Sequence, residues 1–336
     1  MAHLTLDAAY QIAFKALTAA GANDALAAST AKALVRADAQ GLTSHGLSRI
    51  PQYTGHLRNG RANGAAVPRI AKQKGAVLLV DADEGMAFPA CDLAIAKGIE
   101  VARDMGVCFI GIYNSHHCGV VVDHMRAATA AGLVGLGFSN SPSAMPAAGG
   151  RHPVFGTNPI AAAFPRRNGQ PLLIDMSLSE VARGKLMVAA KAGQSIPEGW
   201  ALDVHGQPTT DPQAGMDGSM LPIGAASSSK GAMLALMVEL LVTALIGANF
   251  GFEASTFMEQ EGNVPHLGQS FILIDPGALA GSDAYLDRIE VLLTEILRDD
   301  GVRLPGARRL ELEAAAQSSG ISIPDALLQQ INDMVA

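Results

Sequence analysis

A stretch near the amino end, Ser44-His45-Gly46-Leu47-Ser48-Arg49, places a histidine four residues before an arginine. If the chain is helical here, His45 and Arg49 share one face, because side chains four residues apart are neighbours on a helix. A guanidinium can hold a carboxylate through two parallel hydrogen bonds, and an imidazole exchanges protons near neutral pH. Reduction of a 2-oxo or 2-imino acid needs both groups side by side. The same residues also fit a helix cap at Ser44 followed by two surface side chains.

A second candidate is the pair His116 and His117, which follows an apolar stretch typical of a buried strand. The carboxyl end of a strand is the usual place for ligand contacts in α/β sheets, so a histidine there can stack on a flat ring or donate to it. The alternative is a polar loop in which one histidine caps the next helix. A zinc site is disfavoured, since no carboxylate or cysteine completes a familiar ligand spacing. His124 keeps a metal-dependent lyase or hydrolase open.

Two more polar segments adjoin apolar stretches. The loop 155–159 offers Thr157 and Asn158 beside a flexible glycine, and it can bind a polar ligand or form a structural turn. Asp175 ends the apolar run 172–174. Its carboxylate either caps the next helix or orients a histidine and raises the pKa of that histidine.

Neither common glycine-rich nucleotide motif is present. A dinucleotide site usually carries G-x-G-x-x-G between a strand and a helix, but Gly135-Leu136-Gly137 lies inside a predicted strand and fits a packing feature better. Lys230 follows three serines, yet the glycine that a phosphate loop requires is missing. The motifs alone therefore argue against a Rossmann domain and against an NTPase.

Apolar periodicity predicts the elements that position these side chains. Helices over 5–21, 24–40 and 47–58 form an all-helical amino-terminal unit that carries the Ser-His-Gly stretch in its second loop. Strands then alternate with helices, which indicates an α/β lobe. The predicted strands are 76–81, 107–113, 133–138, 159–164, 171–176 and 270–275, and the predicted helices are 89–105, a segment ending near 131, 180–192, 231–250, 283–298, 308–317 and 324–335. Residues 193–224 are predicted to be irregular.

Length and composition restrict the class of protein. The 336 residues exceed the usual size of one hydrophobic core, so two or three lobes are expected. Charged residues make up 16% of the chain, against ~25% in an average domain, which indicates that another subunit covers part of the surface. The net charge of −7 argues against a nucleic-acid partner.

The sequence also bears on compartment and membrane. The amino end has neither a basic start nor an apolar run, so no secretory signal is predicted. Residues 231–250 are apolar but contain Glu239, which favours a buried core or interface helix over a membrane span. Three cysteines at no metal-like spacing fit a reduced, cytoplasmic protein.

Together these segments resemble the type-2 malate/lactate dehydrogenase family, which includes sulfolactate and ureidoglycolate dehydrogenases and Δ1-piperideine-2-carboxylate/Δ1-pyrroline-2-carboxylate reductases. The matches run in the family's order over nearly the whole chain. They are Ser44-His45-Gly46 with Arg49, Asn114-Ser115-His116-His117, Phe155-Gly156-Thr157-Asn158-Pro159-Ile160, Leu173-Ile174-Asp175-Met176-Ser177, Ala182-Arg183-Gly184-Lys185, Ile196-Pro197-Glu198-Gly199-Trp200-Ala201, Lys230-Gly231 with Met237-Val238-Glu239, and Ile274-Asp275-Pro276.

The resemblance implies an α/β (mixed α+β) chain with the family's non-Rossmann nucleotide-binding fold, an NAD or NADP cofactor and a homodimer. It divides the chain into a helical unit at 1–70, which packs with the carboxyl-terminal helices of 305–336, an α/β lobe at 71–132 and an NAD(P)-binding domain at 133–304. The helical unit is expected to carry dimer contacts and the catalytic Ser-His-Gly stretch. The family fold also explains the missing glycine fingerprint.

By the same resemblance, His45 is the proton donor with Ser44 and Asp175 as relay partners, and Arg49 holds the substrate carboxylate. The residues expected at the cofactor are His117, Ser141, Thr157, Asn158, Asp175, Met176, Ser177, Lys230, Arg303, Gly306 and Arg308. No metal ligand is expected. Some family members use the histidine equivalent to His117 as the acid/base, so the choice between His45 and His117 stays open.

Two departures from the family pattern lie at this expected site. The loop 224–231 before the apolar helix is longer than in the family and lacks its histidine, and Cys118 stands where the family has phenylalanine. The second change bears on how a nicotinamide would stack.

The sequence therefore predicts an NAD(P)H-dependent oxidoreductase that moves hydride to or from C2 of a small 2-oxo or 2-hydroxy acid of the malate/lactate type. Reduction of a cyclic imino acid, Δ1-piperideine-2-carboxylate or Δ1-pyrroline-2-carboxylate, is the alternative in the same class. A catalytically inactive homologue that binds a carboxylate is the alternative in another class. The preference between NADH and NADPH does not follow from the sequence, because no ribose ligand can be placed without the fold.

Overall fold

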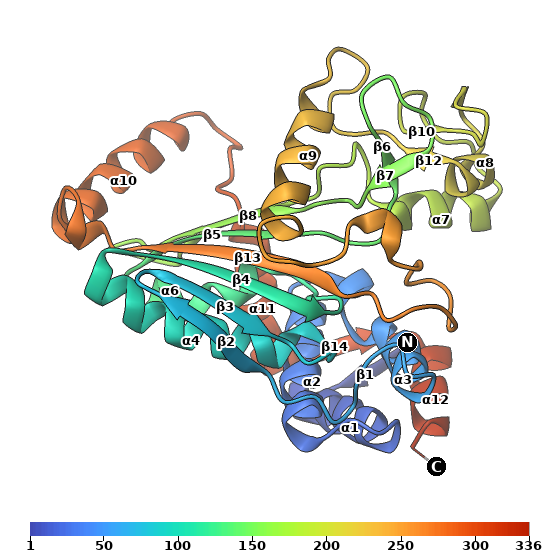
Figure 1. Ribbon diagram of the computed structural model, residues 1–336, viewed down its shortest axis with the longest axis horizontal. Coiled ribbons are helices and arrows are strands. Elements are labelled where there is room, and N and C mark those ends of the chain that lie inside the picture. Colours follow the sequence, from blue (N-terminus) through green and yellow to red (C-terminus); the bar gives the residue numbers. More distant parts are fainter. Residues whose placement is uncertain (336) are drawn as a thin grey trace.

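One large sheet forms the centre of the protein, whose computed structural model describes residues 1–335 (Figure 1). Its seven strands are ordered β2 (Arg69–Lys74), β3 (Val77–Asp81), β4 (Val107–Ser115), β13 (Leu267–Ile274), β5 (Val134–Ser139), β8 (Ile160–Phe164) and β9 (Leu172–Met176). β3 and β4 pair in parallel, and the other neighbouring pairs are antiparallel. The mixed sheet confirms the predicted α/β class and differs from the parallel sheet of a Rossmann domain.

The strand directions place many candidate residues along one edge of the sheet. β4 and β5 both pair antiparallel with β13, and β5 and β9 both pair antiparallel with β8, so β3, β4, β5 and β9 all run the same way. Their carboxyl ends therefore meet where β13 and β8 begin, with Leu267 opposite Ser115 and Ile160 opposite Met176. Segments far apart in the chain converge at this edge.

Helices α4 (Ala87–Met105), α5 (Val121–His124) and α6 (Arg126–Ala130) cover one face of the sheet (Figure 1). The single helix predicted up to residue 131 is two short helices, because the chain turns tightly at Met125. Gly135 and Gly137 let α5 approach β5: a Cβ at Gly135 would lie 2.8 Å from the Met125 sulfur, and one at Gly137 would lie 2.9 Å from Val121. The Gly-Leu-Gly run is thus confirmed as a packing feature.

The amino-terminal helices pack with the carboxyl end of the chain. α1 (Leu6–Ala19) and α2 (Asp24–Ala39) begin at Thr5 and Asn23, whose side chains accept backbone N–H groups. With α3 (Ile50–Arg58), α11 (Ala307–Ser319) and α12 (Asp325–Asp333), they share a buried apolar cluster. The sequence did not predict β1 (Ala2–Leu4) and β14 (Ile321–Ile323), which pair antiparallel and tie the two ends together.

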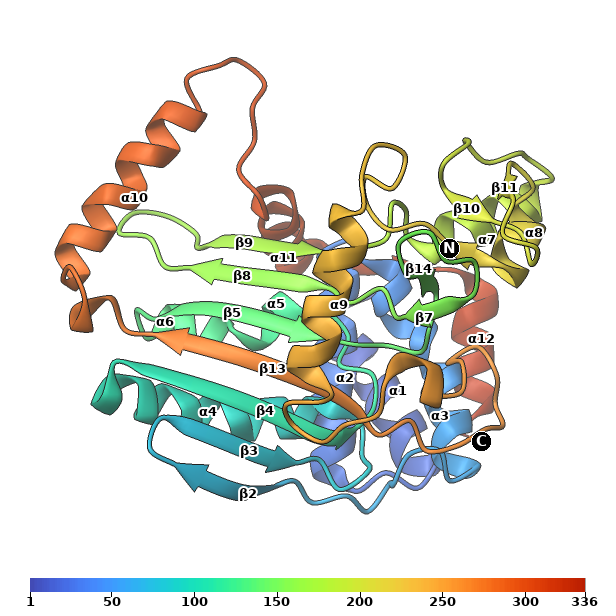
Figure 2. The same ribbon diagram turned by 45° about the horizontal axis from the view of Figure 1, so that its top comes forward.

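The opposite face of the sheet carries α9 (Lys230–Val242) and a small subdomain (Figure 2). The subdomain contains β6 (Met145–Pro146), β7 (Pro153–Phe155), α7 (Arg183–Ala192), β10 (Ala201–Leu202), β11 (Pro208–Thr209), α8 (Pro212–Asp217) and β12 (Ser219–Met220). Residues 193–224 are mostly irregular, as predicted, but contain three two-residue strands, β10, β11 and β12, and the short helix α8. α10 (Ser282–Ile296) projects away from the body of the molecule.

Several helices differ from the predicted bounds, among them α9 and α7. α9 ends at Val242 instead of Phe250, because Thr243 leaves helical geometry and its hydroxyl donates to Glu239 O. α7 begins at Arg183 instead of Glu180, since the Glu180 backbone N–H donates to Leu221 and extends a β-bridge. In residues 1–335, no helix is both long enough and apolar enough to cross a membrane.

Glu239 on α9 is a buried carboxylate that joins three segments. It accepts hydrogen bonds from Asn158 Nδ2 at 2.7 Å, from Gly251 N at 2.7 Å and from Asn140 Nδ2 at 3.4 Å. Burial raises its pKa, and these three donors act against that rise. The carboxylate thus holds the loops after β5, before β8 and before β13 against α9.

We expect Glu239→Leu to lower the free energy of unfolding by about 3 kcal/mol, because it leaves buried donors without an acceptor. Urea unfolding measures the loss. Glu295→Leu, at an exposed glutamate of α10, is the matched control and should change stability little. Equal effects of the two substitutions would contradict a structural role for the Glu239 network.

Candidate functional site

The Ser-His-Gly stretch forms two consecutive 3-10 turns, Thr43–His45 and Leu47–Arg49, instead of one helix. Asp38 on α2 fixes these turns by accepting the Leu47 N–H at 2.7 Å. A Cβ at Gly46 would lie 2.2 Å from the Asp38 carboxylate, so only glycine fits there. The prediction that His45 and Arg49 share one face of a helix is therefore wrong, although both side chains remain in one short stretch.

Arg49 is held by two hydrogen bonds from its own neighbourhood. Its Nε donates to Ser44 O at 2.6 Å, and its Nη1 donates to Gln52 Oε1 at 2.8 Å. Gln52 in turn donates to Phe257 O at 2.7 Å and so links this arginine to the loop before β13. No acidic partner binds Arg49 in the described residues, so its guanidinium can take up a carboxylate.

The imidazoles of His45 and His117 lie almost parallel, with ring centres 5.7 Å apart and planes inclined by 29°. His45 Nδ1 is 2.9 Å from Ser44 Oγ. Burial, followed by the positive charges of Arg49 and Arg309, lowers the pKa of His45 to about 4. His45 is thus a neutral imidazole near pH 7 and can accept a proton there.

His117 makes its hydrogen bond with a residue that the sequence analysis did not single out. Its Nδ1 is 2.5 Å from the hydroxyl of Tyr53, which is fully buried on α3. Burial and the charge of Arg49 hold the pKa of His117 well below its usual range. Tyr53 lies four residues after Arg49, so the helical spacing that drew attention to Arg49 would also have indicated it.

His116 lies outside the site, inside the protein. Its Nε2 is 2.9 Å from His56 Nδ1, and the ring packs against Phe257. The buried guanidinium of Arg61 donates to backbone carbonyls of the same loop, at Ser255, Thr256, Glu259 and Asn263. These contacts position the loop that forms the wall beside His117. In residues 1–335, no group of three His, Cys, Asp or Glu side chains lies close enough to hold a metal ion.

Asp175 is the last residue but one of β9 and caps the start of α5. Its Oδ2 accepts the Val122 N–H at 3.0 Å, and burial raises its pKa to about 6 despite that bond and the charge of Arg309. No hydrogen bond joins Asp175 to His45 in the part of the chain that the structure describes. Arg309 lowers the pKa of both residues, so it links them electrostatically. A relay role of Asp175 stays a prediction.

The other expected cofactor residues lie at the same sheet edge with different exposure. Ser141 Oγ accepts the Thr157 N–H at 3.1 Å, which joins the loop after β5 to the loop before β8. Met176 is exposed and Ser177 partly exposed at the end of β9. Asn158 is fully buried, and its amide donates to Glu239 and to Ala235 O. Its side chain therefore supports the site from inside the protein.

An arginine-rich hollow of about 200 Å³ adjoins β9. It is lined by Arg303, Leu304, Gly306, Arg308 and Arg309. Gly306 has a positive φ, and a Cβ there would lie 2.8 Å from Leu173, so this loop packs tightly on β9. Arg309 was not among the residues that the sequence predicted at the cofactor, although it directly follows Arg308. One of its guanidinium nitrogens, Nη1, is buried without a partner in the described residues. Lys230 is exposed at the start of α9.

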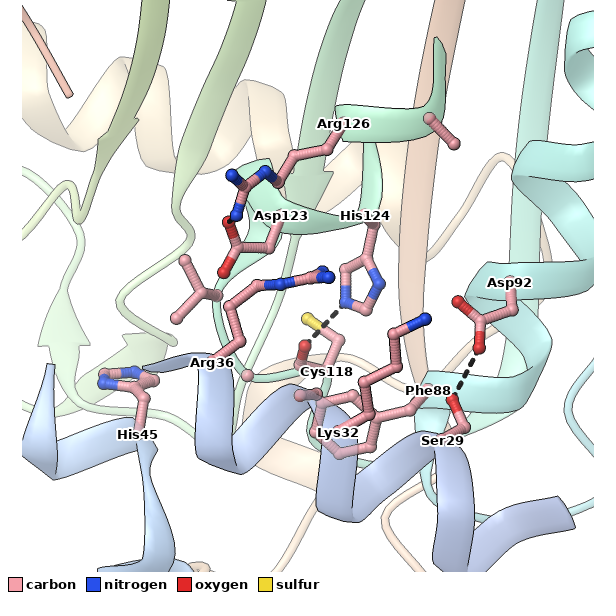
Figure 3. A pocket seen from close by; sticks show the side chains of 14 residues that line it. Ser29, Lys32, Arg36, His45, Phe88, Asp92, Cys118, Asp123, His124 and Arg126 are labelled. Atoms are coloured by element: carbon pink, nitrogen blue, oxygen red, sulfur yellow. Dashed lines mark hydrogen bonds and ion pairs between the residues drawn. The ribbon is translucent and has the colours of Figure 1, made fainter. Parts of the chain in front are cut away.

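A cavity of about 190 Å³ opens beside His45, between α2, α4 and the segment that leads into α5 (Figure 3). Lys32, Arg36 and Arg126 supply positive charge to its wall. The two acidic groups in the wall are engaged: Asp92 accepts from Ser29 at 2.6 Å, and Asp123 accepts from Gln40 at 2.9 Å. The cavity has space for a small polar molecule next to the catalytic candidate.

Comparisons with known proteins agree with this arrangement. The family described as malate/L-lactate dehydrogenase matches residues 4–332. A (2R)-3-sulfolactate dehydrogenase (NADP(+)) of Chromohalobacter salexigens is 47% identical over 98% of this chain and 96% of its own length. A Δ(1)-pyrroline-2-carboxylate/Δ(1)-piperideine-2-carboxylate reductase of Pseudomonas aeruginosa is 35% identical over 98% of both chains.

Two solved structures are similar to this chain over nearly its whole length. The Δ1-piperideine-2-carboxylate reductase of Pseudomonas syringae has a TM-score of 0.93 at 33% identity and covers 99% of this chain and 100% of its own. A sulfolactate dehydrogenase of Methanocaldococcus jannaschii has a TM-score of 0.90 at 30% identity, with 99% and 96% covered.

Substituting Arg309 tests the electrostatic arrangement. We expect Arg309→Met to raise the pKa of His45, because one of the positive charges that disfavour its protonation is removed. An NMR titration of the imidazole protons measures this pKa. Arg58→Met, at the far end of α3, serves as the control. An unchanged His45 pKa in Arg309→Met would show that Arg309 does not act on His45.

Proposed function

We propose that this chain, which belongs to the malate/L-lactate dehydrogenase family and is an NAD(P)-dependent oxidoreductase, transfers hydride between its cofactor and C2 of a small 2-oxo or 2-hydroxy acid. The observation that carries this proposal is the convergence of Arg49, His45 and His117, which come from two distant segments of the chain. An enzyme assay with 2-hydroxy acids and both nicotinamide cofactors tests it.

In this mechanism Arg49 binds the carboxylate at C1. Its hydrogen bonds to Ser44 O and Gln52 hold the guanidinium in one orientation, and its outer N–H groups remain available for two parallel bonds. C2 of the substrate is then placed at the paired imidazoles. Such positioning supplies much of the rate enhancement in a bimolecular reaction.

His45 moves the proton in the proposed mechanism. As a neutral imidazole it accepts the hydroxyl proton when a 2-hydroxy acid is oxidised. A carboxylate bound to Arg49 offsets one of the charges that lower the pKa of His45, so substrate binding raises this pKa and favours the protonated form needed for reduction. Ser44, at 2.9 Å from Nδ1, orients the ring.

The residues around the strand ends fit a dinucleotide. The arginine-rich hollow and the buried, unpartnered Nη1 of Arg309 suit phosphate groups, while Ser141, Thr157, Ser177 and Lys230 line the way from this hollow toward His45 in the proposed binding mode. The bound cofactor supplies or takes up the hydride. We assign Arg303, Arg308 and Arg309 to its phosphates, and Asp175, Met176 and Gly306 to contacts along it.

For the substrate we favour a 2-hydroxy acid with a second anionic group, as in sulfolactate, because the most similar of the relatives described above is a sulfolactate dehydrogenase. Lys32 and Arg36 in the cavity beside His45 supply charge for such a group. Reduction of a cyclic imino acid is the second candidate, supported by the 35% identical reductase. Assays with sulfolactate, malate, lactate, ureidoglycolate and Δ1-pyrroline-2-carboxylate distinguish the two, and no turnover with any would favour an inactive carboxylate-binding homologue.

We expect His45→Ala to abolish turnover in both directions while the affinity for NADPH stays nearly unchanged, since His45 acts on the substrate. Arg49→Ala should mainly raise KM for the acid, by a factor of about 100 for the loss of about 3 kcal/mol of charge-assisted hydrogen bonding. Steady-state kinetics and cofactor fluorescence measure both. Unaltered kinetics in both variants would refute the mechanism.

The cofactor is expected to be NADP(H) in preference to NAD(H), because three arginines without a carboxylate partner in the described residues surround one hollow. Arg303→Gln combined with Arg308→Gln should weaken NADPH binding at least tenfold and NADH binding less. Fluorescence titration with both cofactors measures the ratio, and Arg58→Gln is the control. An equal loss for the two cofactors would place the extra phosphate elsewhere.

We also propose that the protein is a homodimer, and three reduced cysteines fit a cytoplasmic location. Apart from Lys230 and the buried Glu239, α9 is apolar, and it exposes Met233, Leu236, Met237 and Leu240, while α10 exposes Val291, Leu292 and Ile296. Exposed apolar faces of this extent mark subunit contacts. A second copy that covers α9 and packs between it and α10 would bury both.

The double substitution Leu236→Asp/Leu240→Asp should therefore convert the dimer to a monomer with an intact fold, because both side chains are already exposed in the single chain. Light scattering after size exclusion measures the mass. Val204→Asp, at an exposed apolar residue of the small subdomain, should leave the dimer unchanged. The same mass for all three proteins would exclude the α9 interface.

A further inference from the structure

We infer that Tyr53 is a positioning residue that fixes the tautomer of His117, so that His117 presents an N–H donor to the substrate and His45 alone carries the transferred proton. This inference deepens the proposed function and rests on it for the identity of the substrate.

The Tyr53 hydroxyl has a single hydrogen-bond partner in the described residues, the Nδ1 of His117 at 2.5 Å. The side chain is fully buried, and its ring packs near Phe88, His116 and His117. If His117 Nδ1 donated to the tyrosine oxygen, the tyrosine O–H would be left buried without an acceptor. An unpaired buried donor is costly, so the O–H donates and Nδ1 accepts.

Both partners are neutral, which leaves one proton for the histidine ring. Burial raises the pKa of Tyr53 and lowers the pKa of His117. A neutral imidazole whose Nδ1 accepts a hydrogen bond carries its proton on Nε2. That nitrogen makes no hydrogen bond in the described residues. It is absent from the buried polar atoms that lack a partner, so it is accessible to solvent. The Nε2–H group of His117 is thus a free donor at the site.

The imidazole of His45 also has a hydroxyl at its Nδ1, but that hydroxyl belongs to an exposed serine. His45 Nδ1 lies 2.9 Å from Ser44 Oγ, and its ring is stacked on His117 at 5.7 Å. Two parallel imidazolium rings at this distance would repel each other, so at most one of them is protonated. Burial keeps His117 neutral while the Tyr53 O–H donates to its Nδ1, so the transferred proton falls to His45, whose pKa rises when a carboxylate binds Arg49.

The two histidines then divide the reduction between them. A bound nicotinamide cofactor would supply hydride to C2; as that C–H bond forms, the C2=O π bond breaks and its electron pair moves to the oxygen. The Nε2–H of His117 donates a hydrogen bond to that oxygen as the negative charge grows, and it keeps its proton. The protonated His45 gives its proton to the oxygen, which yields the 2-hydroxy acid and a neutral imidazole.

The tautomer can be measured without substrate or cofactor. In protein labelled with ¹⁵N-histidine, long-range ¹H–¹⁵N spectra should show His117 with a protonated Nε2 and an acceptor Nδ1. Tyr53→Phe should remove the acceptor signature of Nδ1, and Tyr10→Phe, on α1, should leave it unchanged. A His117 protonated on Nδ1 in the unaltered protein would overturn the inference, whether or not the enzyme acts on the expected substrates.

Kinetics of matched variants test the division of roles. His117→Gln retains an N–H donor and should keep at least tenfold more kcat than His117→Leu, whereas His45→Gln should be inactive because an amide cannot carry a proton. Tyr53→Phe should lower kcat about tenfold and leave KM for NADPH unchanged. Equal loss in His117→Gln and His117→Leu would make His117 the acid/base. Lack of turnover in the unaltered protein with every acid tested would instead refute the proposed function and leave the tautomer result standing.

Discussion

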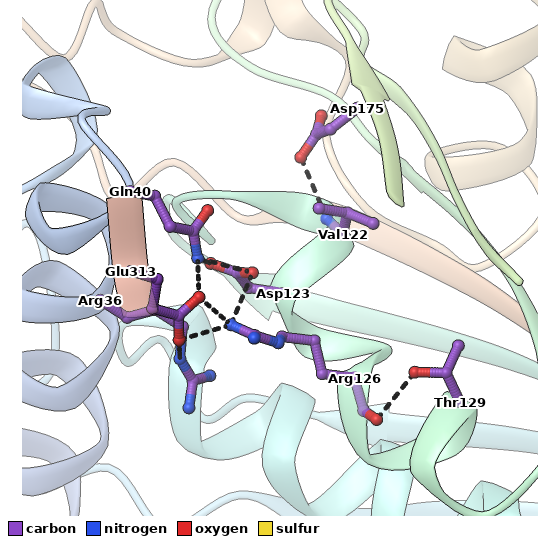
Figure 4. Close-up of polar contacts among 8 residues, drawn as sticks. All are labelled: Arg36, Gln40, Val122, Asp123, Arg126, Thr129, Asp175 and Glu313. Carbon is purple, nitrogen blue, oxygen red and sulfur yellow. Dashed lines mark hydrogen bonds and ion pairs between the residues drawn. The ribbon is translucent and has the colours of Figure 1, made fainter. Parts of the chain in front are cut away.

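The site depends on a partly buried network of charges that joins three parts of the chain (Figure 4). Arg126 on α6 donates to both oxygens of Glu313 on α11, at 2.8 and 2.7 Å. Gln40, at the end of α2, donates to Asp123 on α5 and makes a longer contact to Glu313. Burial raises the pKa of Asp123 and the nearby arginines oppose this, so removing one partner would leave a buried charge uncompensated. The network therefore fixes the helical unit against the sheet edge.

Three members of the network lie next to segments of the candidate site. Gln40 precedes the turns that carry His45, Asp123 follows the residue whose N–H is bound by Asp175, and Glu313 lies four residues after Arg309 on α11. The network thus holds together the separate segments that carry the proposed substrate and cofactor residues. Preorganised donors and charges of this kind do not have to reorient during the reaction.

The loop before β13 is a second example of support from within the protein. The side chains of Gln52, Asn59 and Arg61, which lie on or just after α3, donate to its backbone carbonyls, and His56 contacts one of them. Phe257, in the middle of this loop, lies against His116 and His117. The position of His117 is consequently set from both sides, by Tyr53 on α3 and by this loop.

The sequence by itself determined the family, the α/β class and the approximate place of most helices and strands, because motif order and apolar periodicity are properties of the chain alone. It did not reveal β2, whose residues are exposed without alternation, nor the short strands and the helix within residues 193–224. Only the tertiary structure brought Tyr53 to His117, brought Arg309 near His45 and Asp175, and buried Asn158 inside the protein instead of at its surface. Hydrogen-bond partners and burial depend on contacts between distant segments, and neither spacing nor residue type encodes them.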